Sequence, residues 1–146
     1  MEEFLKLLDE MIPAKDGHPM FLATWDGEYP RVRPVSLVRD GLRFYLGTDR
    51  CCAKSKQIAT NPNVEFVVLL KKEYSGYIRV AGKAVEVTGP QKHEVWERAG
   101  GYDVTHYYED GLDNPQFIMF RIVPERVMLM SPGEMNEKEL PISWFA

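Results

Sequence analysis

Residues 20–48 have the sequence MFLATWDGEYPRVRPVSLVRDGLRFYLGT. Three short runs rich in β-branched and aromatic residues lie within it, at Met20–Trp25, Arg31–Val38 and Leu42–Leu46. They are separated by Asp26-Gly27-Glu28 and Arg39-Asp40-Gly41. An Asp-Gly pair between two such runs is a strong signal for a tight turn. The stretch therefore predicts three consecutive antiparallel strands.

The rest of the chain adds strands and a few short helices to this pattern. The further strands are expected at residues 64–70, 77–87, and 117–123 with 126–130, the last two forming one final strand broken at Pro124. Helices are expected at residues 2–12, 53–59 and 91–99, with an irregular stretch at 100–114. Five to seven short strands with few helices are typical of a closed or partly closed antiparallel barrel. No repeat or linker interrupts the pattern, so one domain is expected.

Charge and hydrophobicity disfavour several classes of protein. Eighteen basic residues against 22 acidic ones give a net charge of −4, whereas nucleic-acid binding rests on a basic field. The longest apolar stretches, such as Val64–Leu70, are too short to span a bilayer. The N-terminus shows no secretory signal. We therefore expect a cytoplasmic protein with a small-molecule substrate, no nucleic-acid partner and no membrane association.

Cysteines and histidines do not have the spacing of a metal site. Cys51 and Cys52 are adjacent, while His18, His93 and His106 are widely separated. No metal is therefore expected. Two interpretations of the cysteine pair stay open: small residues that fill a loop, or a redox-sensitive thiol whose pKa is lowered by neighbouring cations.

Residues in the second expected strand and just after the third could bind a ligand, and those after the third suit a phosphate monoester. Pro34 removes a ladder donor from its strand and leaves neighbouring backbone groups free to bond something else. Thr48 supplies a hydroxyl, and Lys54 opens a short helix whose first amides are unpaired. The alternative is structural: a lysine-rich helix is often a solvated face, and a threonine before a helix is often a cap.

The order of these motifs resembles a known family. Residues 31–62 follow the pattern strand–RxRPV–turn–strand–T–x5–K–x2–QI–x2–NP, and the similarity extends through Gly82–Val87 and Asn114–Pro124. This resembles the FMN-binding split barrel family related to pyridoxamine 5′-phosphate oxidase, over roughly residues 19–130. The resemblance implies a mainly β fold: an antiparallel split β-barrel of Greek-key type with a few flanking α-helices, in a single FMN-binding domain over residues 1–146.

The resemblance also implies how the cofactor is held. The cofactor is FMN, and the residues expected to bind it are Arg33, Pro34 and Val35 along the isoalloxazine ring, Thr48 and Lys54 at the phosphate, and Gln57 supporting the loop. Arg31 competes with Arg33 for the place beside the flavin, and strand alternation does not separate them. Members of the family are usually homodimers with FMN at the subunit interface. Aromatic residues expected to cover the flavin are Trp96, Tyr102, Tyr107 and Tyr108.

Two departures from the family argue against a true vitamin B6 oxidase. Oxidase members commonly carry a basic pair where this chain has Ala53-Lys54, so one phosphate ligand is absent unless Arg50 or Lys56 replaces it. The oxidases also have arginine and histidine in a C-terminal segment that binds the substrate phosphate. Here residues 134–146 contain neither.

The function expected from the resemblance is electron transfer through FMN, from a reduced nicotinamide or another donor to a small acceptor. The cofactor carries the redox chemistry, so no catalytic side chain is named. The alternatives are a non-catalytic FMN carrier, electron-transfer partner or redox sensor, or the same barrel binding haem or a deazaflavin. For haem, His106 is the first candidate ligand.

Overall fold

The computed structural model describes residues 1–12, 18–70 and 76–146, and contains seven strands within them. The strands are β1 (His18–Trp25), β2 (Pro30–Asp40), β3 (Arg43–Asp49), β4 (Asn63–Leu69), β5 (Tyr77–Glu86), β6 (Phe117–Met130) and β7 (Lys138–Leu140). The helices are α1 (Glu2–Met11), α2 (Ala53–Thr60) and α3 (Gln91–Arg98), with three 3₁₀ turns at Val104–His106, Gly111–Asp113 and Ile142–Phe145. Within the described ranges, none of the helices has the length and hydrophobicity needed to cross a membrane.

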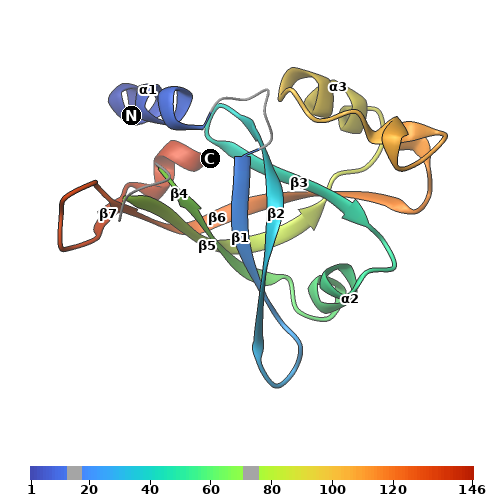
Figure 1. The fold of residues 1–146 in the computed structure, drawn as a ribbon, viewed down its shortest axis with the longest axis horizontal. Coiled ribbons are helices and arrows are strands. Elements are labelled where there is room, and N and C mark those ends of the chain that lie inside the picture. Colours follow the sequence, from blue (N-terminus) through green and yellow to red (C-terminus); the bar gives the residue numbers. More distant parts are fainter. Residues whose placement is uncertain (13–17, 71–75) are drawn as a thin grey trace.

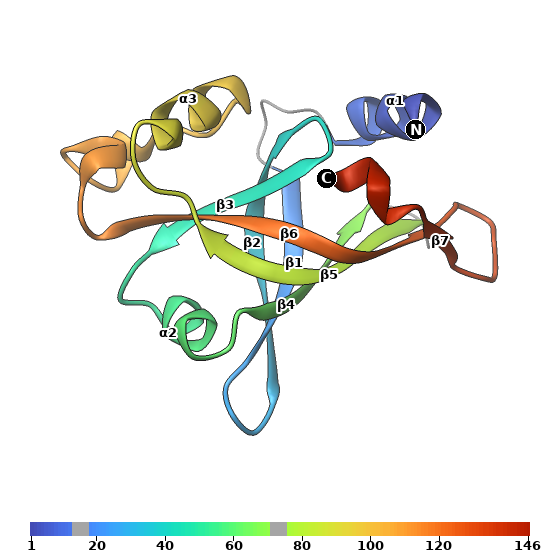
Figure 2. The same ribbon diagram turned by 180° about the vertical axis from the view of Figure 1, so that it is seen from behind.

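The strands form a closed antiparallel barrel of Greek-key type (Figures 1 and 2). The order is β3-β2-β1-β4-β5-β6-β7, and a further pairing of β3 with β6 closes the six-stranded ring. Because β1, β2 and β3 are joined by hairpins and β4 returns beside β1, the spatial order 4-1-2-3 is that of a Greek key. The predicted fold class is confirmed.

Apolar side chains on the inner face of each strand fill the barrel. Alternation directs Met20 and Leu22 of β1, and Phe66 and Val68 of β4, to this core, where all four are almost fully buried. Phe145, near the C-terminus, packs against Phe44 of β3. The C-terminal tail is therefore part of the core, and the two chain ends lie near each other (Figure 1).

A second, smaller core lies on the outside of the barrel. We call residues 91–116, which carry α3 and two of the 3₁₀ turns, the cap segment. Its Trp96 is buried against Phe117 and Tyr102, with ring centroids 5.4 and 5.0 Å apart. The cap segment thereby covers one outer face of β3 and β6 beside the barrel (Figure 2).

The final strand differs from the sequence-based expectation. β6 runs unbroken from Phe117 to Met130, and Pro124 lies inside it opposite Gly82 of β5. The register shifts between Ala81, which pairs with Arg126, and Gly82, which pairs with Pro124, so Glu125 of β6 is the extra residue of a bulge. A Cβ at position 82 would lie 2.1 Å from the Val123 carbonyl oxygen, and this close approach requires glycine. Strand β7 and the last 3₁₀ turn were not expected.

The barrel opens between β2 and β3. These two strands pair only through Val38–Asp40 and Arg43–Tyr45, and beyond Tyr45 β3 continues to Asp49 paired with β6 alone, on its other edge. The first part of β2 is paired with β1 on one side and with no described strand on the other. Its free edge faces the end of β3, and the β1–β2 hairpin projects beyond the barrel (Figure 1).

Candidate functional site

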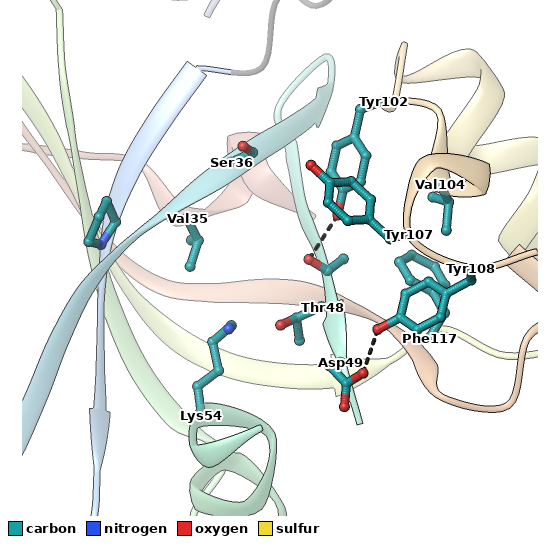
Figure 3. Close-up of a pocket in the computed structure, with 12 residues that line it drawn as sticks. Val35, Ser36, Thr48, Asp49, Lys54, Tyr102, Val104, Tyr107, Tyr108 and Phe117 are labelled. Atoms are coloured by element: carbon teal, nitrogen blue, oxygen red, sulfur yellow. Dashed lines mark hydrogen bonds between the residues drawn. The ribbon is translucent and has the colours of Figure 1, made fainter. Parts of the chain in front are cut away.

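A cleft of about 690 Å³ occupies this opening. It is bounded by the free edge of β2, the end of β3, the first turn of α2 and the cap segment (Figure 3). Its lining residues are Pro34, Val35, Ser36, Gly47, Thr48, Asp49, Lys54, Tyr102, Val104, Tyr107, Tyr108 and Phe117. Four of the six residues predicted to hold the cofactor are among them: Pro34, Val35, Thr48 and Lys54.

Strand β2 contributes main-chain groups as well as side chains to the cleft. Pro34 pairs with Phe21 and Val35 with Met20, so Val35 faces the barrel interior while Pro34 faces outward. A strand edge without a partner exposes N–H and C=O groups. A planar ligand lying along residues 34–36 could bond to them.

The start of α2 supplies the positive charge of the cleft. The Lys54 side chain points into the space between β2 and the tyrosines, close to Thr48 (Figure 3). Of the two residues considered as replacements for the absent basic residue, Arg50 bonds to Glu86 (2.5 Å) and to the Pro115 carbonyl oxygen (3.0 Å). Lys56 is exposed and does not line the cleft. Lys54 is thus the one basic side chain that lines the cleft in the part of the chain that the structure describes.

Arg33 and Gln57, the other two predicted residues, do not line the cleft. Arg33 Nη1 donates to Thr24 Oγ1 (2.7 Å) and to the Leu22 carbonyl oxygen (3.3 Å), and its Nη2 donates to Gln57 Oε1 (3.1 Å). Burial lowers the pKa of Arg33, although the guanidinium stays charged. Their roles in cofactor binding stay predictions.

Arg31 lies in a different setting from Arg33. Its Nε donates to Asp26 Oδ2 (2.7 Å) in the β1–β2 turn. The amides of Tyr29 and Glu28, followed by Arg31, lower the pKa of Asp26 to about 2. Arg31 is therefore held in the exposed hairpin, and Arg33 is the arginine bonded to α2.

The cap segment forms an aromatic wall opposite β2. Tyr102 Oη donates to the Gly47 carbonyl oxygen (3.1 Å) and Tyr108 Oη donates to Asp49 Oδ2 (2.6 Å) (Figure 3). Burial raises the pKa of Tyr102 to about 12. Burial and the Asp49 hydrogen bond raise that of Tyr108 to about 12, so both are phenols at neutral pH. Tyr107 is exposed, and Trp96 lies behind this wall in the second core.

The turn between β3 and α2 carries an acid and a thiol. Asp49 accepts from Tyr108 and from the Cys51 amide (2.7 Å), and both bonds lower the pKa of its carboxyl. Burial raises the pKa of the Cys52 thiol, but hydrogen bonds with the hydroxyls of Ser55 and Thr48 outweigh it and bring the value to about 7. Cys51 lies apart, exposed and bonded to Gln116.

Histidines do not contribute to the cleft. His106 is exposed and its nearest acid, Asp103, is 3.9 Å away. Neither His18 nor His93 lines the cleft. Among the residues that the structure describes, no cluster of metal-binding side chains occurs.

Sequence reasoning missed two polar residues of this region. Asp49 directly follows Thr48, but its hydrogen-bond partner comes from residue 108. Thr24 carries no sequence signal beyond its place in the first expected strand. Its role in the Arg33–Gln57 contact depends on the pairing of β1 with β2 and on the position of α2.

Comparison with known proteins gives the family. The model of the pyridoxamine 5′-phosphate oxidase family matches residues 7–131. The chain belongs to this family. The predicted resemblance is therefore confirmed, and the matched range contains every residue of the cleft.

Individual relatives agree on the fold. General stress protein 26 of Bacillus subtilis (strain 168) is 31% identical over 140 residues, 94% of each chain. A Clostridium acetobutylicum protein described as related to general stress protein 26 superposes with a TM-score of 0.75 at 16% identity, over 100% of this chain and 99% of that one. A haem-binding protein from Mycobacterium smegmatis gives 0.77 at 15% identity, over 97% of this chain and 59% of that one.

Proposed function

We propose that the chain is a single split-barrel domain over residues 1–146 that binds FMN in the cleft. It passes electrons from a reduced nicotinamide or another donor to a small acceptor. The observation that carries the proposal is the placement of Lys54 and Thr48 opposite the free edge of β2, within one cleft of about 690 Å³. FMN has the matching parts, a phosphate at one end and a planar ring with hydrogen-bonding edges at the other.

The phosphate end is assigned to Thr48, Lys54 and the first turn of α2. An ammonium, a hydroxyl and unpaired helix amides are the groups that bind a phosphate monoester. Asp49 adds a negative charge to the same region, and its oxygens are engaged by Tyr108 and the Cys51 amide. The bound phosphate would therefore depend strongly on the single lysine.

The ring end is assigned to Pro34 and Val35, with Arg33 behind them. Bound FMN supplies hydride and single-electron transfer. The chain orients the ring along the β2 edge, while the phenols of Tyr102 and Tyr108 narrow the space open to water. Both phenols also keep their protons at neutral pH.

A homodimer with FMN at the subunit interface fits the outer surface beside the cleft. We call the outer face formed by Phe21, Trp25, Val32, Pro34 and Val67 the apolar sheet face. Val32 is 65% exposed and Trp25 42%, on the two adjacent strands of one hairpin. Contiguous exposed apolar surface marks interaction sites. Since Pro34 belongs both to this face and to the cleft, a second copy seated there would cover the cofactor.

The proposed setting is cytoplasmic, with a small-molecule substrate and no nucleic-acid or membrane partner. The net charge of −4 supports the exclusion of nucleic acid.

Haem in the same cleft is the second candidate, because a haem-binding protein shares the fold at a TM-score of 0.77. The positions of the histidines do not favour it, since none lines the cleft. A titration of the purified protein with haem, followed at the Soret band, tests it directly.

The experiment that tests the main proposal is a titration of the purified protein with FMN, followed by visible absorption and flavin fluorescence. We expect saturation at one FMN per chain. The complex should then bleach under anaerobic conditions with NADH or NADPH. Binding without bleaching by any donor would favour a flavin carrier or redox sensor. No binding by the folded protein would overturn the proposal.

A further inference from the structure

A closed hydrogen-bonded network joins β1, β2 and α2. Thr24 of β1 donates from Oγ1 to Gln57 Oε1 (2.5 Å) and accepts from Arg33 Nη1 (2.7 Å). Arg33 of β2 also donates from Nη2 to the same Gln57 oxygen, 3.1 Å away. Each of the three residues therefore bonds to the other two, and one of the three, Gln57, belongs to α2.

The burial of Thr24 makes this network sensitive to the position of α2. Its side chain is 2% exposed, and a buried hydroxyl is tolerated only where it is hydrogen-bonded. Both hydrogen bonds of Thr24 depend on the present position of Gln57 and Arg33. A shift of α2 would break the bonds from the Thr24 hydroxyl and from Arg33 Nη2 to Gln57 and would leave only the Arg33–Thr24 bond, so the network favours one placement of the helix.

Few other contacts fix α2. It has only eight residues, and a helix of that length is unstable unless it packs on something. Ile58 anchors it in the barrel core, and the Ser55 hydroxyl bonds to the Asp49 carbonyl oxygen (2.6 Å). An apolar contact such as that of Ile58 is non-directional. Rotation about the helix axis is therefore defined by directional contacts, the Ser55 bond and the bonds to Gln57.

Lys54 and Gln57 lie three residues apart in α2, so they share one face of the helix. Anchoring Gln57 to Thr24 and Arg33 therefore also sets the direction in which Lys54 points. We infer that Thr24 is a positioning residue that orients Lys54 toward the phosphate of the cofactor. It acts through Gln57 and together with Arg33. This inference rests on the proposed function, in which Lys54 binds that phosphate.

The test compares two ligands that differ only in the phosphate. Thr24→Val removes the hydroxyl while keeping the shape of the side chain. We expect it to weaken FMN binding roughly fivefold to thirtyfold, because Lys54 is no longer held toward the phosphate. Riboflavin binding should be unchanged. Thr24→Ser should restore the preference for FMN over riboflavin. A general loss of structure would instead weaken the binding of both ligands, and Thr24→Ser would not restore it.

Two further measurements make the result decisive. In a Lys54→Ala background, Thr24→Val should have no additional effect on FMN binding, since the group that it positions is absent. Gln57→Leu, which removes the shared acceptor from a half-buried site, should reproduce the loss in the event that Thr24→Val does not fold. The inference would be overturned, with the proposed function intact, by either of two results. One is that the folded Thr24 and Gln57 variants keep the wild-type preference for FMN over riboflavin. The other is that Thr24→Val weakens FMN binding as much in the Lys54→Ala background as in the wild type. Failure of the wild-type protein to bind FMN would overturn the proposed function together with it.

Discussion

Tyr108 donates a 2.6 Å hydrogen bond to the carboxylate of Asp49, 59 residues earlier in the chain. The bond joins the cap segment to the end of β3 at the rim of the cleft (Figure 3). It holds an aromatic ring over the cleft and at the same time occupies one oxygen of the acid that lies beside Lys54. Packing of the cap segment and the charge distribution of the cleft are therefore coupled through one contact.

Tyr108→Phe should raise the pKa of Asp49. The Tyr108 hydroxyl is the largest cause of the lowered pKa, and the Cys51 amide is the next. A pH titration of the Asp49 carboxyl carbon by NMR measures the change. Tyr107→Phe is the matched control, because Tyr107 is exposed and its ring contacts Tyr102 rather than Asp49. An Asp49 titration that is identical in wild type and Tyr108→Phe would contradict the assignment.

Lys54→Ala should weaken FMN binding about 10- to 100-fold, the loss expected for one hydrogen bond to a charged group. Fluorescence titration at low salt measures the dissociation constant. Lys56→Ala removes an equal charge from the exposed side of the same helix and should change the affinity far less. Equal losses in both variants would mean that only the net charge of α2 matters.

The alkylation rate of Cys52 should rise with pH to half its maximum near pH 7. The thiolate is the reactive form, and the pKa of Cys52 is about 7 because its hydrogen bonds outweigh the effect of burial. A Cys51→Ser background leaves one cysteine to follow with iodoacetamide. Since the thiolate forms as pH rises, the rate must increase with pH. A midpoint near the ordinary thiol value of about 8.5 would refute the effect of Ser55 and Thr48.

The same thiolate should oppose phosphate binding. Above pH 7 it adds a negative charge beside Thr48 and Lys54. Fluorescence titrations should therefore show that the FMN affinity of the wild type falls relative to that of Cys52→Ser as pH rises from 6 to 8, since ionisation of the FMN phosphate affects both proteins alike. Riboflavin serves as the ligand control, because it carries no phosphate charge.

Val32→Asp should convert the proposed dimer to monomers. A carboxylate at this position, 65% exposed, would be solvated in a monomer but buried without a partner in a dimer. Sedimentation velocity at several protein concentrations measures the effect. Val85→Asp, 50% exposed on β5 and opposite Arg121, is the control and should leave the association state unchanged. A wild-type protein that sediments as a monomer would remove the basis of the dimer proposal.

Much of the barrel could be predicted because its signals are local. Strand alternation and the Asp-Gly turns at 26–27 and 40–41 specify the hairpins within a few residues. Thr48 and Lys54 could be placed together for the same reason, as a strand end and the next helix start are close in the sequence. The two arginines were not separable in this way, because they share one strand face.

Contacts between distant segments explain what could not be predicted. Pro124 predicts a strand break, but β6 continues because Gly82 on the neighbouring strand permits a bulge. Tyr108 and Asp49 meet only after the cap segment packs on β3 and β6.

The amino-acid pattern was sufficient for the antiparallel strands, their turns and the motifs of the family, since periodicity, turns and motif spacing are properties of neighbouring residues. The resemblance carried by those motifs implied the Greek-key barrel and four of the cleft residues. Tertiary structure alone placed Arg33 with Thr24 and Gln57, whereas Arg31 bonds to Asp26 within its own hairpin. It also opened the cleft, because the pairing of β3 with β2 ends after only three residues while its pairing with β6 on the other edge continues to Asp49. Such pairings depend on register and on the packing of whole elements, which no local run of residues encodes.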